Sequence, residues 1–303
     1  MRQQHRVGIG FALAVGLTAI ATVTAQQGQA PTRLPGAISV RGTGQTVTGA
    51  YDGWFTNPDG SFGVLVGYYN RNEKEEFDIP IGADNRIEPG GPDRGQPTHF
   101  GPGRQYGIFT VTVPKDFGTQ KLTWTLVSHG QTNAITMHLD PNWVLAPHVD
   151  PGSGNKAPVL KFDPAGAAQF GPPQGLAASL KARVGEPLPL TVWASDEGPT
   201  LAVTTGEPGG VAGRGGRASA NSEFLSPQQL SVTWTKYRGA GAVTFANVRP
   251  QIARADGKAS TTATFDTPGE YVLRAQANDS TGDGGGGFEC CWTNAHVKVT
   301  VVP

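Results

Sequence analysis

The stretch "ASTTATFDTPGEYVLRAQAND", residues 259–279, decides the fold. Both of its halves are rich in Thr, Val, Tyr and Phe, which favour strands, and Pro268-Gly269 between them is a turn signal. Similar strand patterns precede it in "LSVTWTKYRG" (230–239) and "GAVTFAN" (241–247). The chain closes with another strand pattern, "WTNAHVKVTVV" (292–302). About seven short strands separated by turn signals predict a β-sandwich in this half of the chain.

Hydrophobic alternation assigns faces to these strands. In the closing strand Val297, Val299 and Val301 alternate with His296, Lys298 and Thr300, so His296 falls on the face opposite the valines. Because successive strand residues point to opposite sides, we expect His296 to face solvent.

The first half of the chain shows strand patterns of the same kind. Asn57-Pro58-Asp59-Gly60 is a strong turn signal between two strand patterns and predicts a hairpin. "GIFTVTVP" (107–114) alternates with Phe109, Val111 and Val113 on one face, and "KLTWTLVSHGQTNAITMHL" (121–139) reads as a second hairpin. We therefore predict an all-β protein with a second sandwich here.

Composition agrees with this fold class and limits the function. Gly and Pro supply 43 and 24 of the 303 residues without a regular period, as in a turn-rich β-protein. The 24 basic residues balance the 24 acidic ones, so no nucleic-acid partner is expected. No segment after the first 25 residues is apolar enough to predict a transmembrane span.

The N-terminal segment predicts export. Residues 1–25 carry Arg2 and Arg6, an apolar run and the small-residue ending Val23-Thr24-Ala25, which is the pattern of a secretory signal peptide. We expect a periplasmic or extracellular protein with the following organisation. A flexible leader (26–44) precedes an N-terminal sandwich (45–148), a linker (149–156) and a C-terminal sandwich (157–303) that contains a Gly-rich loop (198–229).

The second half resembles a known family. "SVTWTKYRGAGAVTFAN", the Thr262–Asp279 segment and the final "VKVTVV" are similar to immunoglobulin-like sandwiches of the PKD kind. The resemblance implies the fold of residues 157–303 and a role as spacer or binding module. The first half resembles a segment of uncharacterised exported bacterial proteins, which implies export and no particular activity.

The Gly/Pro-rich stretch "GGPDRGQPTHFGPGRQ", residues 90–105, is the first candidate site. It lacks Lys-Ser/Thr and is followed by a strand, so it is no phosphate loop. As a ligand loop it would offer Arg94, His99 and Arg104 to an anionic or sugar ligand. The interpretation that we favour is a proline-stiffened connection with Phe100 packed onto the sandwich.

Two further candidate sites lie near the C-terminus. Asp279, Asp283 and Glu289 surround a Gly-rich loop and could bind Ca²⁺, although a solvated loop is the simpler interpretation.

The adjacent pair Cys290 and Cys291 has three interpretations. The pair could form a vicinal disulfide, or it could bind Cu or Zn with His296 or Glu289. The third interpretation is two reduced thiols on opposite faces of a strand, one of them buried.

No catalytic motif stands out, so no catalytic residue is assigned, and we expect a binding or structural module of the bacterial cell envelope or exterior. Its partner would be an envelope protein or a polysaccharide. One alternative is a polysaccharide-active enzyme or accessory domain with its site near residues 83–106 or between the domains. The other is a metal-handling protein that uses the two cysteines.

Overall fold

The computed structural model describes residues 41–151, 154–197, 230–279 and 290–303. The predicted signal peptide, the leader up to residue 40 and the Gly-rich loop 198–229 lie outside the described residues. The described chain is all-β: it contains strands, turns and a single short 3₁₀ turn, η1 (Pro141–Trp143), and no α-helix. None of its described helical segments is both long and apolar enough for a membrane crossing.

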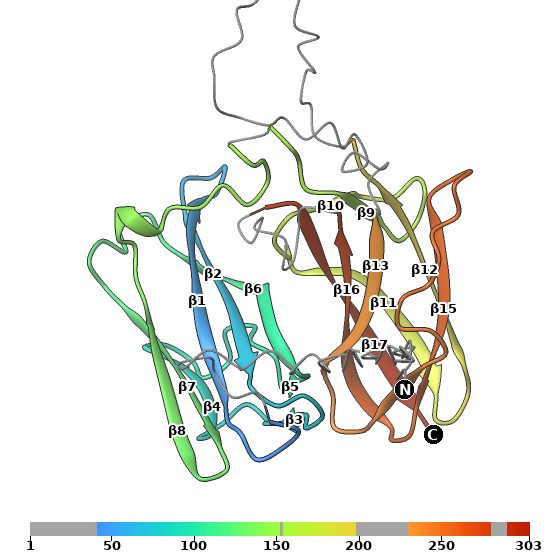
Figure 1. Ribbon diagram of the computed structural model, residues 1–303, viewed down its shortest axis with the longest axis horizontal. Coiled ribbons are helices and arrows are strands. Elements are labelled where there is room, and N and C mark those ends of the chain that lie inside the picture. The colour runs from blue at the N-terminus through green and yellow to red at the C-terminus, as the bar shows by residue number, and fades with distance from the viewer. Residues whose placement is uncertain (1–40, 152–153, 198–229, 280–289) are drawn as a thin grey trace, which may run out of the picture. The chain divides into compact units, whose positions relative to one another are not determined.

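The first sandwich comprises β1 to β8, and its two main sheets have the orders β1-β2-β6 and β4-β7-β8 (Figure 1). A third, two-stranded sheet pairs β3 with β5. The bounds are β1 (Val47–Thr56), β2 (Phe62–Asn70), β3 (Phe77–Asp78), β4 (Asn85–Glu88), β5 (His99–Phe100), β6 (Gly103–Val113), β7 (Leu122–Ser128) and β8 (Gln131–Met137). Both predicted hairpins are confirmed, β1 with β2 and β7 with β8.

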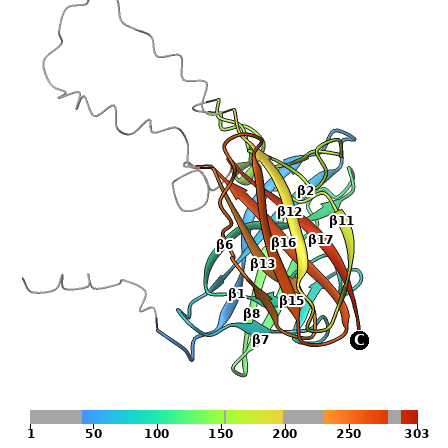
Figure 2. The same ribbon diagram turned by 90° about the vertical axis from the view of Figure 1, so that its right-hand side faces the viewer.

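The second sandwich consists of a five-stranded sheet, β10-β9-β12-β15-β14, and a four-stranded sheet, β11-β17-β16-β13. In Figure 2 the strands of this sandwich face the viewer. The bounds are β9 (Val159–Lys161), β10 (Gln169–Phe170), β11 (Leu176–Arg183), β12 (Leu188–Ser195), β13 (Ser231–Arg238), β14 (Val243–Phe245), β15 (Lys258–Phe265), β16 (Gly269–Asn278) and β17 (Trp292–Val302). The prediction of a β-sandwich in this half is confirmed, and β9, β10 and β11 are strands that the sequence patterns did not reveal.

Each sandwich has its own core. In the first, Phe109, Val111 and Val113 point inward as their alternation predicts, and they pack against Trp124 of the facing sheet. In the second, Trp234 lies in a core built from both of its sheets. The described residues nevertheless form one compact unit, and whether the predicted boundary at 149–156 separates independent domains stays a prediction.

The four-stranded sheet is buried on both faces over part of its length. The first six residues of β17 are all buried, as are Leu273 to Ala277 of β16. One face packs on the core of the second sandwich, and the other meets the first sandwich, where Asn294 Nδ2 donates to Gly107 O at 3.0 Å. The expectation that His296 faces solvent is therefore wrong, because its side of the sheet is covered: His296 is only 8% exposed.

Candidate binding cleft

The 90–105 stretch connects strands of the first sandwich and contacts the second. Thr98 N donates to Tyr237 O at 3.1 Å, and the Tyr237 hydroxyl donates to Gly95 O at 2.5 Å. Phe100 is fully buried against the first sandwich, as predicted. The stretch is thus an ordered connection, and it joins the first sandwich to β13.

An ion pair strengthens the contact between the 90–105 stretch and β13. Arg238 of β13 binds Asp93 through two hydrogen bonds, Nη1 to Oδ2 at 3.0 Å and Nη2 to Oδ1 at 2.7 Å. Its Nε also donates to Gln96 O at 2.8 Å, so all three guanidinium nitrogens hold the connection. The hydrogen bonds from Arg238 lower the pKa of Asp93.

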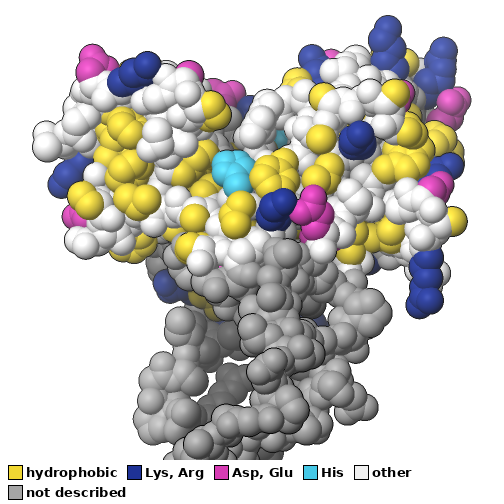
Figure 3. Space-filling view, turned by 90° about the horizontal axis from the view of Figure 1, so that it is seen from above, with side chains coloured by type: hydrophobic (Ala, Val, Ile, Leu, Met, Phe, Trp, Pro, Cys, Tyr) yellow, Lys and Arg dark blue, Asp and Glu magenta, His cyan; other side chains and the backbone are white. Residues whose placement is uncertain are grey.

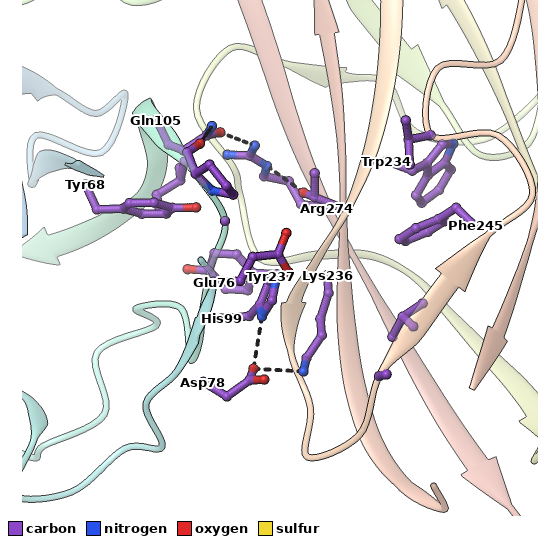
Figure 4. Close-up of a pocket in the computed structure, with 17 residues that line it drawn as sticks. Tyr68, Glu76, Asp78, His99, Gln105, Trp234, Lys236, Tyr237, Phe245 and Arg274 are labelled. Atoms are coloured by element: carbon purple, nitrogen blue, oxygen red, sulfur yellow. Dashed lines mark hydrogen bonds and ion pairs between the residues drawn. The ribbon is translucent and has the colours of Figure 1, made fainter. Parts of the chain in front are cut away.

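Beside this contact lies a cleft of about 400 Å³ with walls from both sandwiches, a volume typical of ligand pockets. Figure 4 shows Tyr68, Glu76, Asp78, His99 and Gln105 on one side of β13 and Trp234 and Phe245 on the other. The cleft therefore lies along the edge strand β13.

A charged cluster forms the first wall. His99 lies between two carboxylates, with Nδ1 3.0 Å from Asp78 Oδ1 and Nε2 3.3 Å from Glu76 Oε2. Lys236 of the second sandwich donates to the same Asp78 oxygen at 2.8 Å. Partial burial opposes ionisation of Asp78, but the hydrogen bonds from His99 and Lys236 outweigh it and lower the pKa of Asp78. Both carboxylates remain more than half exposed, so they keep oxygens for a ligand.

A buried arginine lies between the two walls. Arg274 Nη2 donates to Gln105 Oε1 at 2.6 Å, and Arg274 Nε donates to Thr235 Oγ1 at 3.3 Å. These bonds fix the guanidinium, since Arg274 is only 5% exposed.

The second wall is apolar. It consists of Trp234, Val243, Phe245 and Val248, the last of which is half exposed. Trp234 is itself buried, and its Nε1 has no hydrogen-bond partner within the described part of the chain. A buried N–H without an acceptor is costly, but this nitrogen is not exposed to the cleft, so a bound ligand does not reach it.

The three predicted ligand residues do not share one site in the structure. His99 lines the cleft, whereas Arg94 and Arg104 do not. Arg104 instead pairs with the buried carboxylate of Asp52, and its guanidinium stacks 4.1 Å from the Tyr106 ring centroid. Of the three, only His99 is placed for the role that the sequence suggested.

The predicted metal ligands lie only partly within the described residues. Asp283 and Glu289 lie outside the described residues, and Asp279 is buried and accepts a hydrogen bond from Asn155 at 2.6 Å. His296 packs on Tyr237 at 4.1 Å between ring centroids. Among the described residues no group of three His, Cys, Asp or Glu side chains is arranged to hold a metal ion. A Ca, Cu or Zn site stays a prediction.

Both cysteines are buried, so the third interpretation, in which only one of the two thiols is buried, does not fit the structure. They precede β17 instead of alternating within it, and each is 1% exposed. Strand alternation therefore does not apply to them.

Most cleft residues were missed by sequence reasoning. Glu76 and Asp78 were not singled out, because nothing in the local sequence shows that β13 lies opposite them. Lys236, Arg274 and Phe245 belong to ordinary strand patterns of the second sandwich. The one usable signal was the unusual Gly/Pro-rich connection, which does border the cleft.

Comparisons with known proteins do not assign this chain to a family. No protein-family model and no curated protein matches the chain. Among solved structures, the D00-D0 domain of intimin is 12% identical over 85% of this chain and 100% of that chain, with a TM-score of 0.26. Domains 4 and 5 of the S-layer protein SbsC are 11% identical over 86% of this chain and 98% of that chain, with a TM-score of 0.22. At such TM-scores these likenesses carry no argument, and the function has to be argued from the cleft.

Proposed function

We propose that this chain is an exported binding module of the bacterial cell envelope or exterior, and that it takes a neutral oligosaccharide into the cleft along β13. The signal-peptide pattern of residues 1–25 supports export. The location, volume and chemistry of the cleft support the ligand class.

The charges of the cleft favour a neutral ligand. Glu76 and Asp78 are offset by Lys236 and Arg274, so the lining has no net charge when His99 is neutral. The part of the surface visible in Figure 3 likewise mixes acidic, basic and hydrophobic side chains without one sign predominating. A strongly anionic or cationic ligand would therefore gain little from the field of the site.

The groups left for a ligand match a polyhydroxyl compound. The exposed oxygens of Glu76 and Asp78 accept from hydroxyl groups, and Phe245 offers an apolar ring for the C–H face of a sugar. The single observation that carries the proposal is that exposed carboxylate oxygens of Glu76 and Asp78 and the apolar ring of Phe245 line one cleft.

The cleft is also preformed, since hydrogen bonds fix its walls before any ligand arrives. Lys236 is bound to Asp78, and Arg274 is bound to Gln105, in each case across the two sandwiches. Preorganised walls reduce the entropy that binding costs, as expected of a binding module.

Affinity electrophoresis tests the proposal. The exported protein is run in native gels that contain one neutral polysaccharide each: cellulose derivative, xylan, mannan, starch or mixed-linkage glucan. We expect at least one polymer to retard the wild type, and Phe245→Ala to abolish the retardation. Trp193→Ala is the matched control, because Trp193 is a partly exposed aromatic residue outside the cleft lining. Migration unaffected by every polymer would reject the proposal.

A second candidate function, a polysaccharide-cleaving enzyme, is favoured by one observation. Glu76, His99 and Asp78 converge in the cleft, and paired carboxylates are the usual catalytic groups of glycosidases. Release of reducing sugar from a retarding polymer by the wild type, and its loss in Glu76→Gln, would establish this function. Retardation without release would leave binding as the function.

A further inference from the structure

The adjacent pair Cys290 and Cys291 plays no part in the cleft. Neither thiol is part of a disulfide in the structure, and both are buried. They point to the same place: Cys290 Sγ lies 3.6 Å and Cys291 Sγ 3.9 Å from the carbonyl oxygen of Asn155. The two thiols are also in hydrogen-bonding contact with each other. Neighbouring strand residues would direct their side chains to opposite faces, so a local turn brings the two sulfurs together.

The backbone of Cys291 makes this turn. Its φ is 75°, in the left-handed region that non-glycine residues seldom adopt, at a cost of about 1 kcal/mol or more. The turn is held in place by Asp279 N, which donates to Cys291 O at 3.3 Å. A strained turn that brings two adjacent thiols into contact points to a covalent use of the pair.

We propose that Cys290 and Cys291 form a vicinal disulfide in the exported protein. The two thiols lose two protons and two electrons as the Sγ–Sγ bond forms. The electrons reduce the disulfide of a thiol–disulfide oxidoreductase, which takes up two protons and becomes a dithiol. This step is independent of the proposed oligosaccharide binding and rests only on export to an oxidising compartment.

The bond forms before the pair is buried. In the folded protein the contact with Cys291 and burial raise the pKa of the Cys290 thiol, so it is a poor nucleophile there. The unfolded chain has ordinary thiols that an oxidoreductase can reach. Adjacent α-carbons are only about 3.8 Å apart, below the usual disulfide range, so the ring is strained and easily reduced when exposed. Burial of both sulfurs then protects it from reductants.

The disulfide would stiffen the chain at the point where the two sandwiches meet. Cys291 is followed by Trp292, which is fully buried in a cluster with Phe55, Leu65 and Leu145 of the first half. A ring closed over residues 290 and 291 restricts the turn that directs Trp292 into this cluster. The oxidised protein is therefore expected to unfold a few degrees above the reduced one.

Thiol labelling of the full chain tests the proposal. The chain is exported to a bacterial periplasm, trapped in acid, unfolded in guanidinium and treated with iodoacetamide before mass measurement. We expect no label and an intact mass lower by two hydrogen atoms than the reduced chain, and two labels after prior reduction with dithiothreitol. The same chain produced in a reducing cytoplasm without its first 25 residues should take two labels directly.

A single-cysteine variant is the control, and three results would overturn the proposal. Cys290→Ser retains one thiol and should take one label with or without dithiothreitol, which shows that unfolding exposes the site. Two labels on unreduced periplasmic protein would overturn the proposal. It would also be overturned by a disulfide-linked dimer on a non-reducing gel, or by thiols that label fully once EDTA has removed bound zinc.

Discussion

Gly107 of β6 lies directly against the indole of Trp292 in β17, so closely that a Cβ on Gly107 would overlap the six-membered ring. Gly107 also has a φ of 52°, which a residue with a side chain adopts only with strain. The first sandwich thus approaches the second at a point that only glycine can occupy, and this close approach positions the strands that border the cleft.

Gly107→Ala should destabilise the protein by about 2–4 kcal/mol, because overpacking and backbone strain add. Urea denaturation followed by circular dichroism measures the change. Gly91→Ala is the control: a Cβ at Gly91 meets nothing within 4 Å, and Gly91 has no positive φ. Equal midpoints for the two variants would show that the junction tolerates a side chain and that the packing is looser than described.

Arg238→Ala should lower the free energy of unfolding by about 1–2 kcal/mol, a modest value because Asp93 is half exposed and the pair is partly screened. The loss includes the bond to Gln96 O. Arg183→Ala, which removes one exposed hydrogen bond to Pro303 O, is the control and should change stability little. A midpoint for Arg238→Ala that matches this control would mean that the connection is not held by β13.

His296 should make stability pH-dependent. Burial, aided by Arg274 and Arg238, lowers the pKa of His296 from its ordinary 6.5 to about 3. Its other neighbours are the Tyr237 ring and the backbone of Ile108. Below pH 6.5 the unfolded chain binds a proton that the folded chain does not, so the free energy of unfolding falls with pH. Between pH 7.5 and 5 the loss should be about 2 kcal/mol.

Urea denaturation at both pH values, on wild type and His296→Gln, isolates this contribution. The pKa of His148 is also lowered by burial and adds pH dependence of the same sign to both proteins, so it cancels in the comparison. The variant should be less stable at pH 7.5 but should lose less stability on acidification. Identical slopes for the two proteins would contradict the burial of His296 as a neutral side chain.

The sequence was a good guide where one face of a strand meets solvent. The inward positions of β6 and both hairpins followed from alternation and turn signals, because hydrophobic side chains in such strands occupy every second position. The same reasoning failed at β17, where His296 is buried because a second sandwich covers the outer face of its sheet. Nothing within an eleven-residue strand records what packs on it.

Prediction from the sequence was limited in the same way at the candidate site. His99 was found from its unusual Gly/Pro-rich surroundings, whereas nothing in the local sequence pointed to its partners Glu76 and Asp78. Lys236 is 158 residues away from Asp78 in the chain, so only the folded structure brings them together.

Calorimetric titration with soluble oligosaccharides of the five polysaccharides tests the central claim most directly. The wild type should bind one of them in the cleft, and Phe245→Ala, which removes the apolar ring of the second wall, should bind about tenfold more weakly. Trp193→Ala is the control: it removes a partly exposed aromatic ring outside the cleft lining, and its affinity should equal that of the wild type. Equal affinity of Phe245→Ala and wild type, or no binding by the wild type, would contradict the claim that the cleft along β13 is an oligosaccharide site.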